Sequence, residues 1–211
     1  MLRNRHDLVI KTASGKGGIA ERLFGSTATH LMRKCPYPVW VIKPTHRKKY
    51  ARILAAVDPD PRDKKRNALN AKIMELATSL ARIEGSELHV VHAWRLFGEK
   101  ILSSPGRMSQ SEVDKLARKA RIEHEGWISE LVEKHSLGLP KVMIHLLKGN
   151  AEALIPALAK RKGIELIVMG TVTRTGIAGF IMGNTAERVL QQVDCSVLTV
   201  KPAGFITPVK R

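Results

Sequence analysis

Residues 170–185 read GTVTRTGIAGFIMGNT, and this stretch decides how the rest of the chain is interpreted. It follows an apolar run, Leu166–Met169, and precedes an amphipathic stretch, so we predict a loop that joins a strand to a helix. Glycines let such a loop approach a ligand closely, and the N–H groups of the next helix face it, which makes the loop a natural anion site. Asn184, with Glu187 three residues later, predicts an N-cap with a capping box and a helix that begins at Thr185. The alternative is a glycine-rich turn before a well-capped helix, with no ligand.

The chain contains this stretch twice. A shift of 158 positions places Asp7–Pro44 on Glu165–Pro202 without a gap, with Gly25 on Gly183 at the start of the helix. We interpret this match as an internal repeat of a whole structural unit. The second copy follows a full domain's worth of sequence and the first follows only six residues. We therefore expect the N-terminal copy to be the tail of a domain whose front is missing.

The chain alternates strands with helices, and its strands are continuously apolar, which predicts an α/β fold. Residues 50–203 are expected to form a complete unit, an open parallel five-stranded sheet with helices on both faces. Residues 1–45 then form a strand-helix-strand fragment of a second copy with a parallel strand pair, 204–211 form a tail, and the basic linker Thr45–Tyr50 marks the boundary. The expected strands are Asp7–Lys11, Val39–Ile42, Arg52–Val57, Leu88–Ala93, Lys141–Leu147, Glu165–Met169 and Ser196–Val200.

Helix ends are predicted from capping residues and breakers. Ser26 is expected at the N-cap of the first helix, and Gly85 is expected to end the second. A long helix is predicted over Ser109–His135, with Val113, Leu116, Ala120, Trp127 and Leu131 on one face. A shorter helix is expected from Gly149 to Lys160. Trp94–Met108 lacks periodicity and is predicted to be a loop beside the site, a candidate mobile cover.

Composition excludes several protein classes. No run approaches the roughly 18 apolar residues of a membrane span, and the first residues are too few and too charged for a signal peptide. Two cysteines, Cys35 and Cys195, are too few for a disulfide framework, so we expect buried thiols and a cytoplasmic protein. The net charge is +17, and residues 1–50 hold eleven Lys and Arg against two acids. This balance favours an anionic partner, such as nucleotide or nucleic acid, or it is a solvated basic surface, since no aromatic side chains are interleaved with it.

Two expected strand ends carry the candidate binding residues. Asp58 ends the first strand of the complete unit and Gly170 ends the fourth, so both should lie at the carboxyl edge of the sheet, where such folds bind ligands. A carboxylate beside an amide-rich loop suits a nucleoside phosphate. The alternative is that Asp58 only stabilises an Asp-Pro turn. No catalytic constellation is evident, and His89 and His92 lie three apart on a strand, on opposite faces, which argues against a shared metal.

Residues 50–203 resemble a universal stress protein domain. The resemblance rests on the strand and helix order, the acid after the first strand, Val168-Met169-Gly170-Thr171, and Gly183-Asn184-Thr185. It implies a Rossmann-like fold and a tandem protein with a shortened first domain. It also implies a non-enzymatic binding role with ATP and Mg²⁺, or with no cofactor, although slow ATP hydrolysis stays open. Adenine would lie near Ala93 and ribose near Asp58.

The loop departs from the family's nucleotide-binding pattern of Gly-x2-Gly-x9-Gly-Ser/Thr. Gly170 and Gly183 match it, but Thr173 replaces the second glycine and Asn184 replaces the serine. Arg174 and the hydroxyl groups of Thr173 and Thr185 are expected to compensate in part.

The resemblance further implies that last strands pair, with Val39–Ile42 beside Val197–Val200, and that the protein self-associates in this way. Three functions follow as hypotheses. The first is a stress-response module that binds an adenine nucleotide or another anionic small molecule. The second is a dimerisation and interaction module with an empty site. The third is nucleic-acid binding through the basic first quarter, with affinity that falls steeply with salt.

Overall fold

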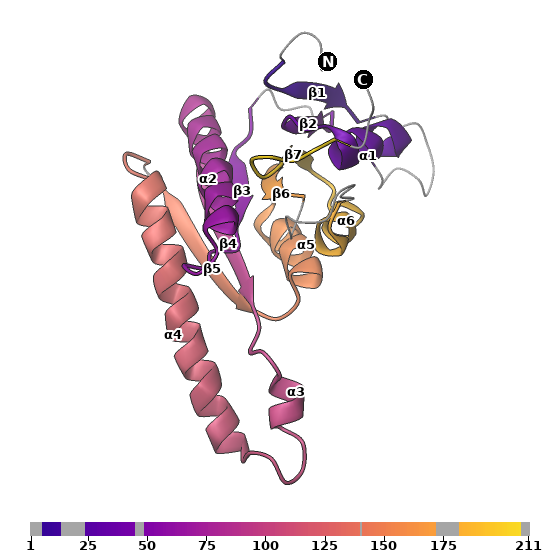
Figure 1. Ribbon diagram of the computed structural model, residues 1–211. Coiled ribbons are helices and arrows are strands. Elements are labelled where there is room, and N and C mark those ends of the chain that lie inside the picture. Colours follow the sequence, from indigo (N-terminus) through magenta and orange to yellow (C-terminus); the bar gives the residue numbers. More distant parts are fainter. Residues whose placement is uncertain (1–5, 14–23, 45–48, 140, 172–181, 208–211) are drawn as a thin grey trace.

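A computed structural model of the chain describes residues 6–13, 24–44, 49–139, 141–171 and 182–207 (Figure 1). The described strands form one seven-stranded sheet in the order β1-β2-β7-β6-β3-β4-β5. Their bounds are β1 Val9–Thr12, β2 Val39–Ile42, β3 Arg52–Ala56, β4 Glu87–Trp94, β5 Val142–Lys148, β6 Leu166–Gly170 and β7 Ser196–Val200. The described helices are α1 Gly25–Lys34, α2 Lys64–Glu84, α3 Glu99–Leu102, α4 Gln110–His135, α5 Ala151–Lys162 and α6 Asn184–Leu190.

Strands β7, β6, β3, β4 and β5 are all parallel, which confirms the predicted five-stranded unit. Apolar residues of α2 and α4 pack against one face of the sheet, and those of α1, α5 and α6 pack against the other. Figure 1 shows these two groups of helices on opposite sides of the strands. The α/β class and the placing of helices on both faces are therefore confirmed.

The N-terminal strands continue the same sheet. Strand β2 pairs in parallel with β1 and antiparallel with β7. Trp40 lies opposite Leu198, which is the residue equivalent to Trp40 in the 158-residue repeat. The β2 and β7 strands are thus related by a local two-fold axis at this pair, and the expected pairing of last strands occurs within the chain. Because β6 holds its other side, β7 has no free edge for a second copy.

Several helix ends differ from the prediction. Helix α1 begins at Gly25 after an N-cap at Phe24, so Ser26 is not the cap; Gly25, at φ 77°, makes the turn into the helix. Helix α6 begins at Asn184 with Gly183 at its N-cap, so Asn184 is not the cap either. The Glu187 carboxylate forms an ion pair with Arg33 of α1 instead of a capping box. The predicted stop of α2 at Gly85, which is left-handed at φ 70°, is confirmed.

The long helix α4 contacts the sheet over only part of its length. Ile128 and Val132 in its second half are buried, whereas Leu116 is 38% exposed. In Figure 1 the first half of α4 and the one-turn helix α3 extend away from the body, beyond the end of β4. Of the predicted apolar face in this first half, Val113 is buried and Ala120 is half-buried, so the prediction is wrong at Leu116, where no described strand lies beside the helix. The segment Trp94–Met108 includes the end of β4 and α3, and it does not fold back over the ends of β3 and β6.

Candidate functional site

The strand order reverses between β3 and β6. From β3 the chain continues through α2 to β4 on one side, while β6 and then β7 lie on the other side. Strands β3 and β6 are parallel neighbours, with Ala56 opposite Met169, so Asp58, just past β3, and Gly170, the last residue of β6, lie at the carboxyl ends of adjacent strands, as predicted. Ala93 near the end of β4 lies two residues past Val91, the partner of Ala56, and is level with Asp58. Ligands of open α/β sheets bind at such a switch point.

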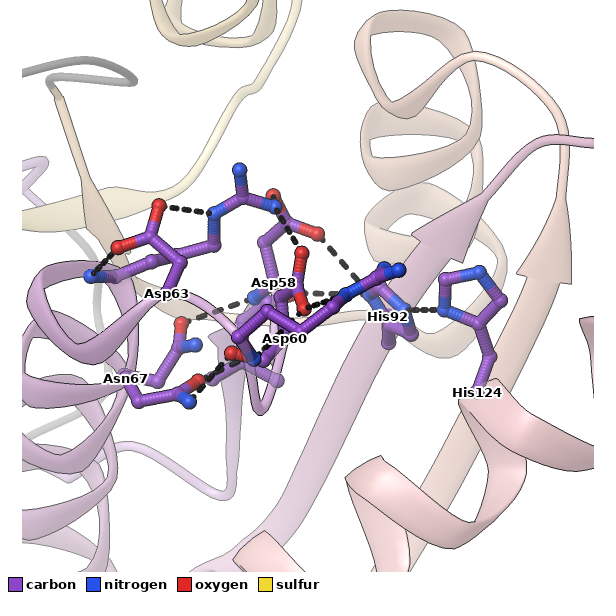
Figure 2. A network of polar contacts seen from close by, with 10 residues as sticks. Asp58, Asp60, Asp63, Asn67, His92 and His124 are labelled. Atoms are coloured by element: carbon purple, nitrogen blue, oxygen red, sulfur yellow. Dashed lines mark hydrogen bonds and ion pairs between the residues drawn. The ribbon is translucent and has the colours of Figure 1, made fainter. Parts of the chain in front are cut away.

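The turn after β3 is held by asparagines of α2 (Figure 2). The Asp58 N–H donates to Asn70 Oδ1 at 3.0 Å, and the Asp60 N–H donates to Asn67 Oδ1 at 3.1 Å. Asp63 is the N-cap of α2, where its carboxylate accepts from the Arg66 N–H at 2.9 Å. Asn70, Asn67, Asp60 and Asp63 therefore stabilise the turn, and the Asp58 carboxylate is left for other contacts.

Arg66 lies among three carboxylates. Its guanidinium is 3.2 Å from Asp58 Oδ2, 3.8 Å from Asp60 Oδ2 and 3.4 Å from Asp63 Oδ2. The Asp58 side chain is 55% exposed. Loss of hydration nevertheless raises the pKa of Asp58, and the positive charge of Arg66 opposes this rise. The result is an accessible acceptor that already has a cationic neighbour.

A chain of two histidines leads from Asp58 toward α4. His92 Nδ1 lies 3.7 Å from Asp58 Oδ1 and 3.3 Å from the Val57 carbonyl oxygen, and His92 Nε2 lies 2.8 Å from His124 Nδ1. Because a carbonyl only accepts, His92 Nδ1–H donates to Val57, and the Nδ1–H of His124 donates to the lone pair of His92 Nε2. Burial lowers the pKa of His92 to about 4, with a further effect from His124. Burial also lowers the pKa of His124, so both rings are neutral near pH 7 and His124 keeps an Nε2 lone pair.

Aromatic rings surround His124. Its ring stacks on Trp94 with centroids 5.3 Å apart and meets the edge of Trp127 at 4.6 Å. The guanidinium of Arg62 lies over Trp127 at 5.6 Å. The end of β4 thus carries an aromatic cluster beside the acidic turn.

The sequence interpretation missed Arg66, His92, His124 and the two asparagines. The prediction that His89 and His92 point to opposite faces of a strand is confirmed. His89 faces the other way, with its Nδ1 2.9 Å from His145 Nε2. The spacing of Asn67 and Asn70 by three on one helix was the available signal for the turn. Nothing local could place His124, because its register against β4 depends on how α4 packs.

The glycine loop is described only at its two ends. The Gly183 N–H donates to the Thr171 carbonyl oxygen at 2.8 Å, so the loop closes at its base beside β6. Asn184 is exposed and Thr185 is half-buried at the start of α6. Thr173 and Arg174 lie outside the described residues. A Cβ at Gly170 would lie 2.8 Å from Leu69 Cδ2, the end of a half-buried side chain of α2, so a side chain at position 170 would require Leu69 to move.

Two further features bear on the kind of site. Within the described ranges, no group of three or more His, Cys, Asp or Glu side chains is placed to hold a metal ion. A search of the same residues finds no helix with the length and apolar character needed to cross a membrane. Cys35 and Cys195 are both buried free thiols, and burial raises the pKa of Cys195 to about 12.

Comparisons with known proteins agree with this architecture. A model of the universal stress protein family matches residues 3–43 and 49–201. Universal stress protein E of Escherichia coli K12 is 32% identical over 97% of the chain, which covers 64% of that protein's length.

Two solved structures are also similar. A functionally unknown protein, PA1789, from Pseudomonas aeruginosa PAO1 has a TM-score of 0.73 and 26% identity over 93% of this chain and 63% of that one. A putative universal stress protein from Pseudomonas aeruginosa UCBPP-PA14 has a TM-score of 0.67 and 28% identity over the same shares. The chain therefore spans less than two thirds of these relatives, and it belongs to the universal stress protein family.

Proposed function

We propose that this protein is a cytoplasmic stress-response protein that binds an adenine nucleotide at the carboxyl ends of β3, β4 and β6. The observation that carries the proposal is the Asp58 carboxylate, which lies 55% exposed at the switch point beside the strand that ends in Gly170. Its backbone N–H is already held by Asn70, so the side chain is not needed for the turn. A carboxylate in this place suits the two hydroxyl donors of a ribose.

The other contacts follow from the strand ends. The base would lie near the backbone of Ala93, beside the ring cluster of Trp94 and His124. The phosphates, with Mg²⁺ when ATP binds, would lie against the loop between β6 and α6. The residues proposed there are Gly170, Thr173, Arg174, Gly183, Asn184 and Thr185. The protein's role in this proposal is binding and sensing, and no catalytic residue is assigned.

The ion pair between Arg66 and Asp58 competes with ligand binding at the Asp58 carboxylate. A ribose that takes the Asp58 carboxylate must share it with the guanidinium or displace it. Exposed ion pairs of this kind contribute about 0 to 1 kcal/mol, and Arg66 keeps Asp60 and Asp63 as partners when Asp58 turns to a ligand. The ion pair is therefore compatible with binding.

Calorimetric titration with ATP and Mg²⁺ tests the proposal. We expect saturable binding to the wild-type chain, weakened at least about tenfold by Asp58→Ala. Asp194→Ala is the matched control. This carboxylate is 87% exposed and lies just before β7, at the amino ends of the parallel strands, whereas the proposed site lies at their carboxyl ends. Absence of heat from folded wild-type protein, or equal binding by the Asp58→Ala variant, would refute the nucleotide site.

A second function is favoured by one specific observation. Gly170 packs beside Leu69 of α2, which favours a small residue there, so the first glycine of the loop need not indicate a phosphate. The protein would then act as an interaction module with an empty site. Folded protein that gives no heat with ATP would favour this function. Nucleic-acid binding through the basic first quarter stays a prediction, tested by the salt dependence of affinity.

We also propose a domain organisation. Residues 1–45 form the C-terminal part of one stress protein unit, 50–203 form a complete unit and 204–211 form a tail. Matching hydrogen bonds in the two copies support this proposal. Ala13 N–H donates to Ile42 at 2.8 Å, and Thr171 N–H donates to Val200 at 3.2 Å, at positions related by the 158-residue shift.

A further inference from the structure

The outermost strand, β1, has an open edge and an apolar face. Leu8 is 40% exposed and Ile10 is 58% exposed, and both lie on the face of the sheet that α2 and α4 cover further along. Val9, on the opposite face, is buried among residues of α1. Among the described residues no strand pairs with the outer edge of β1. Surface of this kind normally marks an interaction site.

The repeat shows how the same positions are used in the complete unit. Leu166 and Val168 of β6 are the equivalents of Leu8 and Ile10, and both are fully buried. Strand β3 pairs in parallel with β6, with Leu54 opposite Ile167. Helix α2, which follows β3, then covers the face of β6 through residues such as Leu69 and Ile73. In this copy, β3 therefore pairs with the edge of β6, and α2 covers the apolar face of β6.

The backbone of β1 is ready for a parallel neighbour. The N–H groups of Val9 and Ala13 donate inward, to Pro38 and Ile42 at 3.0 and 2.8 Å. By alternation, the N–H and C=O groups of Ile10 and Thr12 point outward. The Lys11 ammonium donates to the Thr12 carbonyl oxygen at 2.8 Å in an exposed contact. A lysine on an edge strand hinders non-specific pairing with other strands. The single exposed hydrogen bond from Lys11 is weak enough for a specific partner strand to displace.

Trp40 adds an independent observation. It lies opposite Ile10 in the register, on the same face, and packs against Tyr50 with ring centroids 6.0 Å apart. Its Nε1–H is shielded from solvent and has no hydrogen-bond partner among the described residues. A buried donor without a partner costs about 1 to 3 kcal/mol, so the packing around Trp40 is incomplete among the described residues.

We propose that β1 is a docking edge for a β-strand followed by a helix, supplied by a partner polypeptide that is not a second copy of this chain. The strand adds in parallel to the edge at Ile10, as β3 adds to β6. Its helix covers Leu8, Ile10 and Trp40, as α2 covers the equivalent residues. The partner is thus a polypeptide with the front of a stress protein unit. This proposal does not depend on nucleotide binding at Asp58.

The chain itself supplies the probe. A fluorescent peptide of residues 50–85 carries β3 and α2, the unit that closes the edge in the complete copy. Titrated with the full chain, it should show saturable anisotropy and slow the hydrogen exchange of the Ile10 amide. Ile10→Lys should weaken binding at least about tenfold, because the charge lies where the helix packs. Ile10 is more than half exposed, so this change should leave the fold intact, which circular dichroism checks.

Ile144→Lys is the matched control. Ile144 is 43% exposed on β5, the strand at the opposite edge of the sheet, so this variant should bind the peptide like the wild type. Absence of saturable binding, or equal loss in both variants, would overturn the proposal. A dimer of the chain that Ile10→Lys abolishes, without peptide binding, would assign the edge to a second copy and also overturn it. Loss of nucleotide binding would not affect any of these readouts.

Discussion

Acid should destabilise this protein through His92. The side chain is 1% exposed, and burial lowers its pKa from 6.5 to about 4, with a further contribution from His124. Between these two pKa values, the unfolded chain binds a proton at His92 that the folded chain does not bind. The contribution of the neutral ring to the free energy of unfolding is therefore fully present above the unfolded pKa of 6.5 and is lost as pH falls toward 4. Between pH 7 and pH 5 these two pKa values give a loss of about 2 kcal/mol in the free energy of unfolding.

Urea denaturation at both pH values measures this loss in the wild type and in His92→Gln. The amide keeps a polar group near His124 but takes up no proton, so the fall in stability of the variant should be smaller by about 2 kcal/mol. His145, with its lowered pKa, and Asp58, with its raised pKa, are present in both proteins, so their contributions largely cancel. His30→Gln, at an exposed position on α1, is the control and should fall like the wild type. An equal fall in the His92→Gln variant would refute the argument that burial keeps this ring neutral.

Two further changes test the packing around the site. Asp63→Ala removes the N-cap of α2 and should cost about 1 kcal/mol in urea denaturation; an unchanged midpoint would show that Asp60 and Asn67 hold the turn alone. Burial lowers the pKa of Lys201 to about 8, while its ammonium donates to the Met32 carbonyl and the Thr171 hydroxyl. Because a lowered lysine pKa favours folding as pH rises, the wild type should gain about 1 kcal/mol between pH 7 and pH 9, and Lys201→Met should lose that gain. The same gain in the variant would assign it to other groups.

The sheet was predictable because its signals are local or repeated. Continuous apolar runs give β2 and β7 with the observed bounds, and the 158-residue repeat indicates that the two copies share one architecture. The pairing of β2 with β7 required the family resemblance, since no local pattern specifies which edges meet. Helix starts were predicted less well. Gly183, which has no side chain to cap with, is the N-cap of α6. Glu187 forms an ion pair with Arg33, a residue 154 positions away, instead of the predicted capping box.

The candidate site was predictable where it depends on strand ends and missed where it depends on packing. Asp58 and Gly170 follow from the order of strands and helices along the chain, whereas Ala93 was implied by the family resemblance. Arg66 and His124 enter the site because α2 and α4 approach β4 at a particular register, which a helical period does not fix. The histidine pairs show the same limit: alternation along β4 separates His89 from His92, but their partners on β5 and α4 come from tertiary structure.

The proposed docking edge and the switch point share one geometric cause. In the complete unit, β3 lies beside β6, which creates the switch point and brings Asp58 next to Gly170. The equivalent of Gly170 in the first copy is Thr12, whose side chain is exposed. A Cβ at position 170 would crowd the end of the Leu69 side chain. A helix docked over β1 must therefore leave room for a threonine, so we expect the partner to carry a residue smaller than leucine at the position equivalent to Leu69.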